Sequence, residues 1–103
     1  MLERDATVED LEQLHTYVHE HLCESENLLA DQFRTTRRPL FTRDVLCGIE
    51  FSLQGLRAIR LGAIWAADQN VIYFYNAKGE RAVKVKLSQR FPIETTESTL
   101  APA

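Results

Sequence analysis

Cysteines, long apolar runs and enzyme motifs are scarce or absent in this sequence. Only two of its 103 residues are cysteine, and Cys23 and Cys47 lack the spacing of a disulfide framework, which favours two reduced thiols in a cytosolic protein. No stretch approaches the length of a membrane span, and residues 1–5 precede no apolar run of the kind that signal peptides contain. The sequence therefore predicts a cytoplasmic protein without membrane contact.

Signatures of catalysis and metal binding are weak. The sequence contains no paired carboxylates, no glycine-rich phosphate loop and no nucleophile elbow. His15, His19 and Cys23 recur every four residues, so a helix would align them as zinc ligands, but a convincing fourth ligand is missing. Cys47 with His15 or His19 is a weaker hypothesis, because Cys47 falls in an apolar row and is expected to be buried. We expect no metal and no cofactor, and a metal or thiol enzyme is the least favoured reading.

Length and composition are those of one ordinary globular domain. Hydrophobic residues make up 45% of the chain and charged residues 26%. We predict a single domain over residues 1–94 and a disordered tail over 95–103, whose residues are polar or small. Residues 1–33 carry nine acids and one base, whereas residues 34–90 carry eleven bases and four acids. This division predicts an acidic helix beside a basic sheet, or a charged partner surface.

The first third of the chain has the periodicity of an amphipathic helix. Thr7 is a good N-cap, and apolar residues recur at three and four positions over residues 8–23. Beyond that, the helix either continues to Phe33 or gives way to a short second helix over residues 26–32, capped by Ser25. The same apolar residues fit a heptad seam, but packing on a sheet explains them and is more common.

Residues 45–87 read as four strands joined by three tight turns. Gly55, Asn70 and Gly79 each stand at the fourth turn position, where a left-handed backbone favours glycine or asparagine. The turns then place Ser52 opposite Leu56, Ala67 opposite Val71, and Asn76 opposite Glu80. The predicted fold is α+β: an N-terminal amphipathic helix packed on one face of a four-stranded antiparallel meander in the order 1-2-3-4. Residues 40–42 are a candidate extra edge strand.

These registers assign every strand residue to one of two faces, because side chains alternate along a strand. The face predicted to lie under the helix carries Cys47, Ile49, Phe51, Ile59, Leu61, Ala63, Trp65, Val71, Tyr73, Tyr75, Val83, Val85 and Leu87. The opposite face is polar at its edges but apolar in the middle, where Ile64, Ile72 and Phe74 are expected to be neighbours.

That second face is the predicted interface. Its candidate residues are Glu50, Arg60, Ile64, Ile72, Phe74, Lys84 and Lys86. An apolar centre within a charged rim is typical of protein interfaces, and a twofold arrangement would pair Glu50 with Arg60 or Lys84 of a second copy. We therefore predict a small non-enzymatic binding or regulatory module that forms a homodimer. The alternatives are another protein partner, a dimer through the helix, or residues 91–93 folding back over the patch.

A nucleic-acid-binding protein is the second hypothesis. It would use the basic residues of 34–90, above all a cluster before the sheet formed by Arg34, Arg37, Arg38 and Arg43. Basic side chains interleaved with aromatic ones bind single strands by charge and stacking. The registers count against this hypothesis, because they turn Trp65, Tyr73 and Tyr75 inward and leave only Phe74 among the lysines.

Overall fold

The computed structural model describes residues 1–91, apart from the side chain of Ala58, so the predicted tail over 95–103 lies outside the described residues. In chain order, its elements are β1 (Leu2–Ala6), α1 (Leu11–Ser25), the 3₁₀ helix η1 (Ala30–Gln32), β2 (Thr35–Thr42), β3 (Val45–Gln54), the 3₁₀ helix η2 (Leu56–Ala58), β4 (Arg60–Ala66), β5 (Val71–Tyr75) and β6 (Arg81–Leu87). No helix within residues 1–91 is long and apolar enough to cross a membrane.

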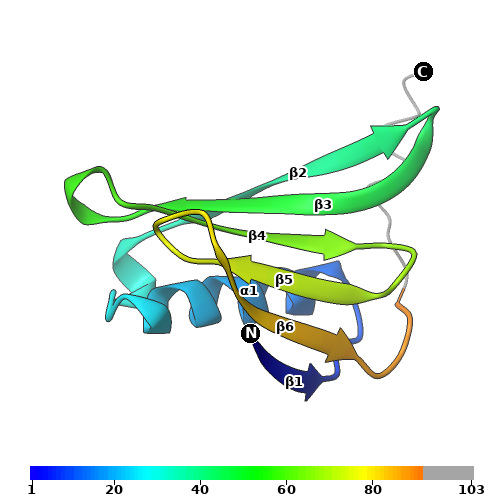
Figure 1. Cartoon of the computed structure of the whole chain (residues 1–103), viewed down its shortest axis with the longest axis horizontal. Helices are drawn as coiled ribbons and strands as arrows, with labels where there is room; N and C mark the ends of the chain where they lie inside the picture. Colours follow the sequence, from blue (N-terminus) through cyan, green and yellow to red (C-terminus); the bar gives the residue numbers. More distant parts are fainter. Residues whose placement is uncertain (92–103) are drawn as a thin grey trace.

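The fold is α+β, as predicted, with one helix packed on a mixed and mostly antiparallel sheet (Figure 1). The sheet has six strands in the order β1-β6-β5-β4-β3-β2. β1 pairs with β6 in parallel, and the other neighbouring strands pair antiparallel. The prediction of four strands is therefore wrong in number, although β3 to β6 do form the expected meander. We call the face covered by α1 the helix-side face, and the opposite one the open face.

The two strands that the sequence did not assign are both at sheet edges. β2 extends the candidate edge strand of residues 40–42 to eight residues. β1 precedes the helix, and four of its five residues are exposed. Neither strand has the clean apolar alternation that marks a half-buried strand, which explains why pattern reading missed most of them.

The helix starts later than predicted and ends two residues beyond Cys23. Asp10 is its N-cap, and its carboxylate accepts a 2.8 Å hydrogen bond from the backbone N–H of Gln13, so Thr7 is not the cap. The helix ends at Ser25, where Asn27 adopts a left-handed φ of 55° and a 2.8 Å bond joins the N–H of Leu28 to the carbonyl of Cys23. Continuation to Phe33 is therefore wrong, and the predicted second helix is reduced to the single turn η1.

The core lies between α1 and the helix-side face. The helix contributes Leu11, Leu14, Val18, Leu22 and Cys23, and the sheet contributes Ile49, Phe51, Leu53, Leu61, Ala63, Trp65, Ile72, Phe74, Val85 and Leu87. The amphipathic helix face is thus confirmed. Most of the predicted inward row of β3, β4 and β6 is confirmed as well.

The first predicted turn is wrong, but the error leaves the assignment of side chains to the two sheet faces unchanged. β3 continues to Gln54, and Leu53 pairs with Leu61, whereas the sequence had placed Ser52 opposite Leu56. The connection instead uses η2, in which Arg57 has a φ of 57°. The shift moves the pairing by an even number of residues, so the same side chains of both strands still face the helix.

The second predicted turn is wrong by one residue, which does exchange the faces of β5. Ala66, and not Ala67, pairs with Val71, so the loop holds four residues. Asn70 keeps the expected left-handed φ, at 55°. Its buried carboxamide accepts a 3.0 Å hydrogen bond from Trp65 Nε1 and donates a 2.8 Å bond to the carbonyl of Gln89, which holds the longer loop in place.

The third predicted turn is confirmed. Gly79 has a φ of 81°, and the N–H of Asn76 donates to the carbonyl of Glu80 at 2.9 Å. A register shift between Phe74 and Tyr75 then moves the pairing by one residue, so that Phe74 lies beside Val83. β6 therefore keeps its predicted face while β5 is reversed.

Candidate interface on the open sheet face

The open face contains five of the seven predicted interface residues. These five are Glu50, Arg60, Ile64, Lys84 and Lys86. Ile72 and Phe74 are corrections: they lie in the core with 0% and 2% of their surface exposed, because the one-residue shift turns them toward the helix. Tyr73 and Tyr75 take their place and are partly exposed.

Arg81 contacts both of these partly exposed tyrosines. Its guanidinium carbon lies 4.2 Å from the ring centroid of Tyr73, and its Nε donates a 3.0 Å hydrogen bond to the hydroxyl of Tyr75. This bond raises the pKa of Arg81 above its ordinary value. The Tyr73 hydroxyl donates to Gln69 Oε1 at 2.8 Å. Both rings are therefore held in fixed positions on the open face.

One row of side chains crosses the whole open face, and we call it the central row. In order from β1 to β2 it consists of Glu3, Lys84, Tyr73, Ile64, Glu50 and Arg38, each the direct cross-strand neighbour of the next. Its charges run negative, positive, two uncharged positions, negative and positive. Arg38 and Glu50, at one end, form an ion pair within the chain.

A hollow adjoins the central row, between the β5–β6 turn and the middle strands. It measures about 630 Å³, and its lining includes Ser52, Arg60, Gly62, Tyr75, Asn76 and Lys78. Gly62 lies beside Tyr75 across the strands. The hollow is open to solvent.

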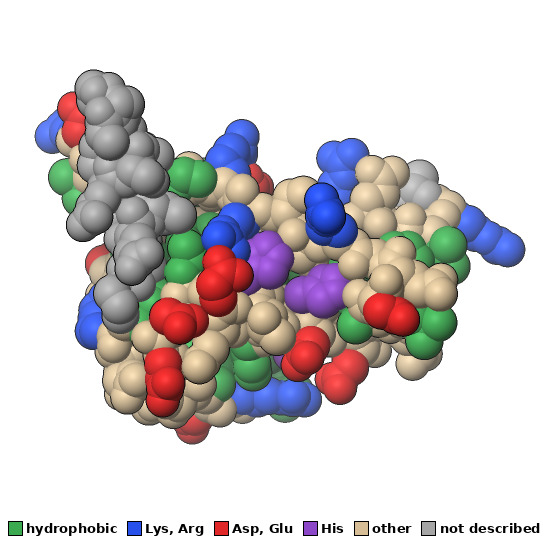
Figure 2. All heavy atoms as spheres, turned by 180° about the vertical axis from the view of Figure 1, so that it is seen from behind, with side chains coloured by type: hydrophobic (Ala, Val, Ile, Leu, Met, Phe, Trp, Pro, Cys, Tyr) green, Lys and Arg blue, Asp and Glu red, His purple; other side chains and the backbone are tan. Residues whose placement is uncertain are grey.

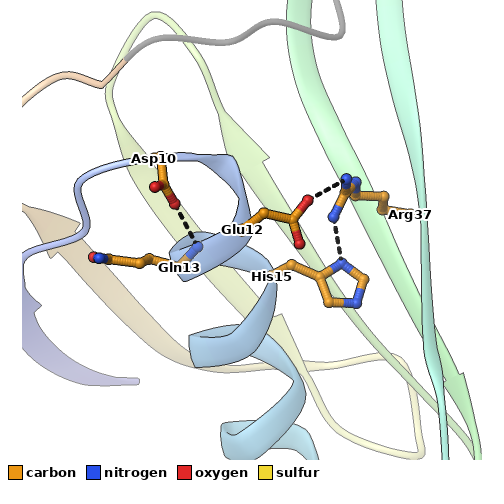
Figure 3. Close-up of polar contacts among 5 residues, drawn as sticks. All are labelled: Asp10, Glu12, Gln13, His15 and Arg37. Atoms are coloured by element: carbon orange, nitrogen blue, oxygen red, sulfur yellow. Dashed lines mark hydrogen bonds and ion pairs between the residues drawn. The ribbon is translucent and has the colours of Figure 1, made fainter.

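A polar cluster joins α1 to β2 at the edge of the helix-side face (Figure 3). Arg37 donates from Nη1 to His15 Nδ1 at 3.0 Å and from Nη2 to the Glu12 carboxylate at 3.1 Å. Burial lowers the pKa of His15 below its ordinary value, and the nearby Arg37 guanidinium adds to the shift. His15 is therefore neutral at pH 7, as its role as a hydrogen-bond acceptor requires.

His19 and His21 also serve the packing of α1. The nitrogens of His19 lie 2.8 Å from Thr35 Oγ1 and 2.8 Å from the carbonyl of Ala30, so the ring joins the helix to η1 and β2. His21 stacks on Phe74 with ring centroids 3.9 Å apart, and burial lowers its pKa. Figure 2 shows histidine side chains on the helix side of the molecule, among basic and acidic side chains.

The residues considered for metal and thiol chemistry are engaged elsewhere. No group of three or more His, Cys, Asp or Glu within residues 1–91 is arranged to hold a metal ion. Cys23 is buried, which raises the pKa of its thiol and disfavours the reactive thiolate. Cys47 is exposed, contrary to expectation, because it is skipped in the β2–β3 pairing, and its thiol lies 3.3 Å from the carbonyl of Leu40.

The predicted arginine cluster is divided between the two faces. Arg37 points to the helix side, whereas Arg38 lies on the open face beside Glu50. Arg34 precedes β2, and Arg43 follows it in the tight turn before β3, with a φ of 53°. The four side chains therefore do not form one basic surface.

Comparisons with protein-family models, with curated proteins and with solved structures find no match for this chain.

Proposed function

We propose that this protein is a non-enzymatic cytoplasmic binding module that pairs with a second copy of itself through the open face. The observation that carries the proposal is the charge order of the central row. In the proposed dimer, two open faces pack together about a twofold axis that is parallel to the strands and passes between β4 and β5. This axis reverses the strand order of one copy relative to the other. Lys84 of one copy then faces Glu50 of the other, and the twofold axis makes this pair occur twice.

The same axis matches the rest of the central row. Glu3 at one edge faces Arg38 at the other, and Tyr73 faces Ile64 in the middle. Two packed sheets lie about 10 Å apart and cross at about 30°, so the match is closest near the axis and looser at the edges. The central Lys84–Glu50 pairs and the Tyr73–Ile64 contacts therefore carry most of the specificity.

The size and composition of the face support a stable interface. Six strands about 4.8 Å apart, with about six residues each rising about 3.3 Å, offer a flat area of about 600 Å². A corrugated surface of that extent approaches the ~800 Å² per partner of a standard interface. Tyrosine and arginine, which dominate binding energy at interfaces, are present as Tyr73, Tyr75 and Arg81.

Charge exchange tests this proposal. Sedimentation equilibrium should give a dimer for the wild type and mainly monomer for Glu50→Lys and for Lys84→Glu, because each change places like charges together twice. The double variant should recover the dimer. Glu20→Lys, an exposed change on α1, is the control with the same charge difference. A wild type that stays monomeric at high concentration would contradict the proposal, as would a folded double variant that does not recover.

A second function is favoured by one observation. Tyr73 and Tyr75 point to the open face with Arg81 and Lys84 around them, so the main objection to single-stranded nucleic-acid binding no longer holds. Against it, Arg81 already lies over the Tyr73 ring, and Glu50 shares the same row. Fluorescence anisotropy with labelled single-stranded DNA and RNA would show salt-dependent binding that Tyr73→Ala abolishes if this function holds. The dimer proposal predicts no such binding.

A further inference from the structure

The charge order of the central row does not account for the hollow that lies beside this row. Gly62 forms part of its floor, and the β5–β6 turn with Asn76 and Lys78 forms one wall. Gly62 does not have a positive φ, so its backbone does not require glycine. A Cβ there would lie 3.3 Å from the carbonyl oxygen of Phe51, a tight contact that a shift of a few tenths of an ångström would relieve. The main effect of the glycine is to leave space on the open face.

We infer that this hollow receives the Tyr75 ring of the second copy. The inference rests on the proposed dimer and names the contact that sets its register. The twofold axis that matches the central row also places Tyr75 of one copy over Gly62 of the other, because these two residues are cross-strand neighbours on β5 and β4. A large side chain thus meets the position where this face has no side chain.

The neighbouring pair follows the same relation. On the open face, Tyr73 and Tyr75 of β5 lie beside Ile64 and Gly62 of β4, whereas Val71 is buried within the chain with 5% of its surface exposed. In both pairs the residue on β5 is the larger, and the difference is greater at the hollow. Packing β5 of one copy on β4 of the other therefore interdigitates large with small, whereas packing β5 on β5 would bring the tyrosines into conflict.

The Tyr75 ring is held in place before any partner arrives. Arg81 donates to its hydroxyl at 3.0 Å and lies over the Tyr73 ring, which limits the rotamers of both side chains. Fixing a contact residue in the free chain reduces the entropy lost on association. The hollow also presents Ser52 and Arg60 as polar groups near its floor.

Directed cross-linking tests the register. In a Cys47→Ser background, which removes the exposed thiol and leaves the buried Cys23, Gly62→Cys and Tyr75→Cys are purified separately, mixed and treated with a short bismaleimide. The mixture should give covalent dimers several-fold faster than either variant alone. Introducing only one new cysteine per chain avoids cross-linking of the two positions within one chain, where they are neighbours.

A second pair guards against loss of the dimer in Tyr75→Cys. Ile64→Cys mixed with Tyr73→Cys probes the same register in the central row and should show the same preference. In addition, Tyr75→Ala should weaken the dimer by about 30-fold, as expected for a central aromatic anchor, while Gln32→Ala, an exposed change on η1, should change it little. Circular dichroism of each variant confirms that it is folded.

The outcomes separate the two proposals. A monomeric wild type overturns both. A dimer that responds to charge exchange as described above, but in which neither mixture cross-links faster than its components, leaves the proposed function standing and overturns the inference. Preferential cross-linking of each variant with itself would also overturn it, because that result places identical strands opposite each other.

Discussion

The two faces of the sheet are formed by the same strands but differ in how deeply their side chains are buried. On the helix-side face, side chains such as Phe51 and Leu61 have about 1% of their surface exposed and pack against α1. On the open face, Ile64 and Tyr73 remain partly exposed and lie in a row with charged neighbours. Because side chains alternate, each strand contributes to both faces at once. The contrast separates residues that are packed in the core from residues that remain accessible at the surface.

Truncation of matched residues on β4 should reveal the contrast most strongly. Leu61→Ala should lower the free energy of unfolding by about 3 kcal/mol, because it leaves a cavity in a packed core. Ile64→Ala, on the other face of the same strand, should lower it by less than about 1 kcal/mol in the monomer. Urea unfolding at low protein concentration measures both. Equal losses would mean that the open face is packed within the chain.

The loop that orients β5 offers the next largest effect. Asn70→Ala removes the acceptor of Trp65 Nε1–H inside the core and places alanine at a positive φ, so it should cost about 2 kcal/mol. Gln69→Ala is the control, since it removes only an exposed bond to the Tyr73 hydroxyl and should stay within about 0.5 kcal/mol. Thermal or urea unfolding monitored by tryptophan fluorescence reports both. Similar effects of the two changes would argue against the buried role of Asn70.

The start of α1 gives a smaller effect. Asp10→Ala should cost about 1 kcal/mol, because the N–H of Gln13 loses its acceptor, whereas Asp10→Asn should preserve most of the cap. Thr7→Ala should have a smaller effect than Asp10→Ala, since Thr7 bonds the Ser88 hydroxyl at an exposed position. Denaturant midpoints of the three variants distinguish the caps. A larger effect at Thr7 would place the helix start where the sequence alone suggested.

Acidification should lower stability through two histidines on the helix side. The pKa values of His15 and His21 are lowered from the ordinary value of 6.5, so both groups are neutral in the folded chain. As pH falls below 6.5, the unfolded chain takes up protons before the folded chain does, and stability decreases. Urea unfolding between pH 7.5 and 5.5 should show this decrease, and the double variant His15→Gln, His21→Phe should reduce it. A stability that rises on acidification would contradict the neutral state of both rings.

Sequence reasoning could predict the helix and the β3–β4 faces because those segments have strong periodicity. The inward rows of β3, β4 and β6 follow from apolar alternation, and the turn at Gly79 follows from its backbone requirement. The order of the four central strands follows from the short connections between them.

The composition of the open face was harder to predict because it depends on single-residue details. Asn70 indicates a left-handed residue but does not reveal whether the loop holds three or four residues, and both Ile72–Phe74 and Tyr73–Tyr75 are apolar enough to face the core. The bond between Asn70 and Trp65 decides between them, and it is a contact between side chains that no local pattern encodes. β1 was missed because its pairing with β6 joins residues about 80 positions apart.

Mixing two charge variants tests the central claim most directly. Glu50→Lys alone and Lys84→Glu alone should each sediment as monomer, but an equimolar mixture should form a heterodimer, because the proposed axis then places opposite charges together at both contacts. Glu20→Lys mixed with Arg34→Glu carries the same charges at exposed positions away from the open face and controls for general attraction. Sedimentation equilibrium of the mixture is expected to give a dimer mass. A mixture that remains monomeric, with both variants folded, would contradict the account.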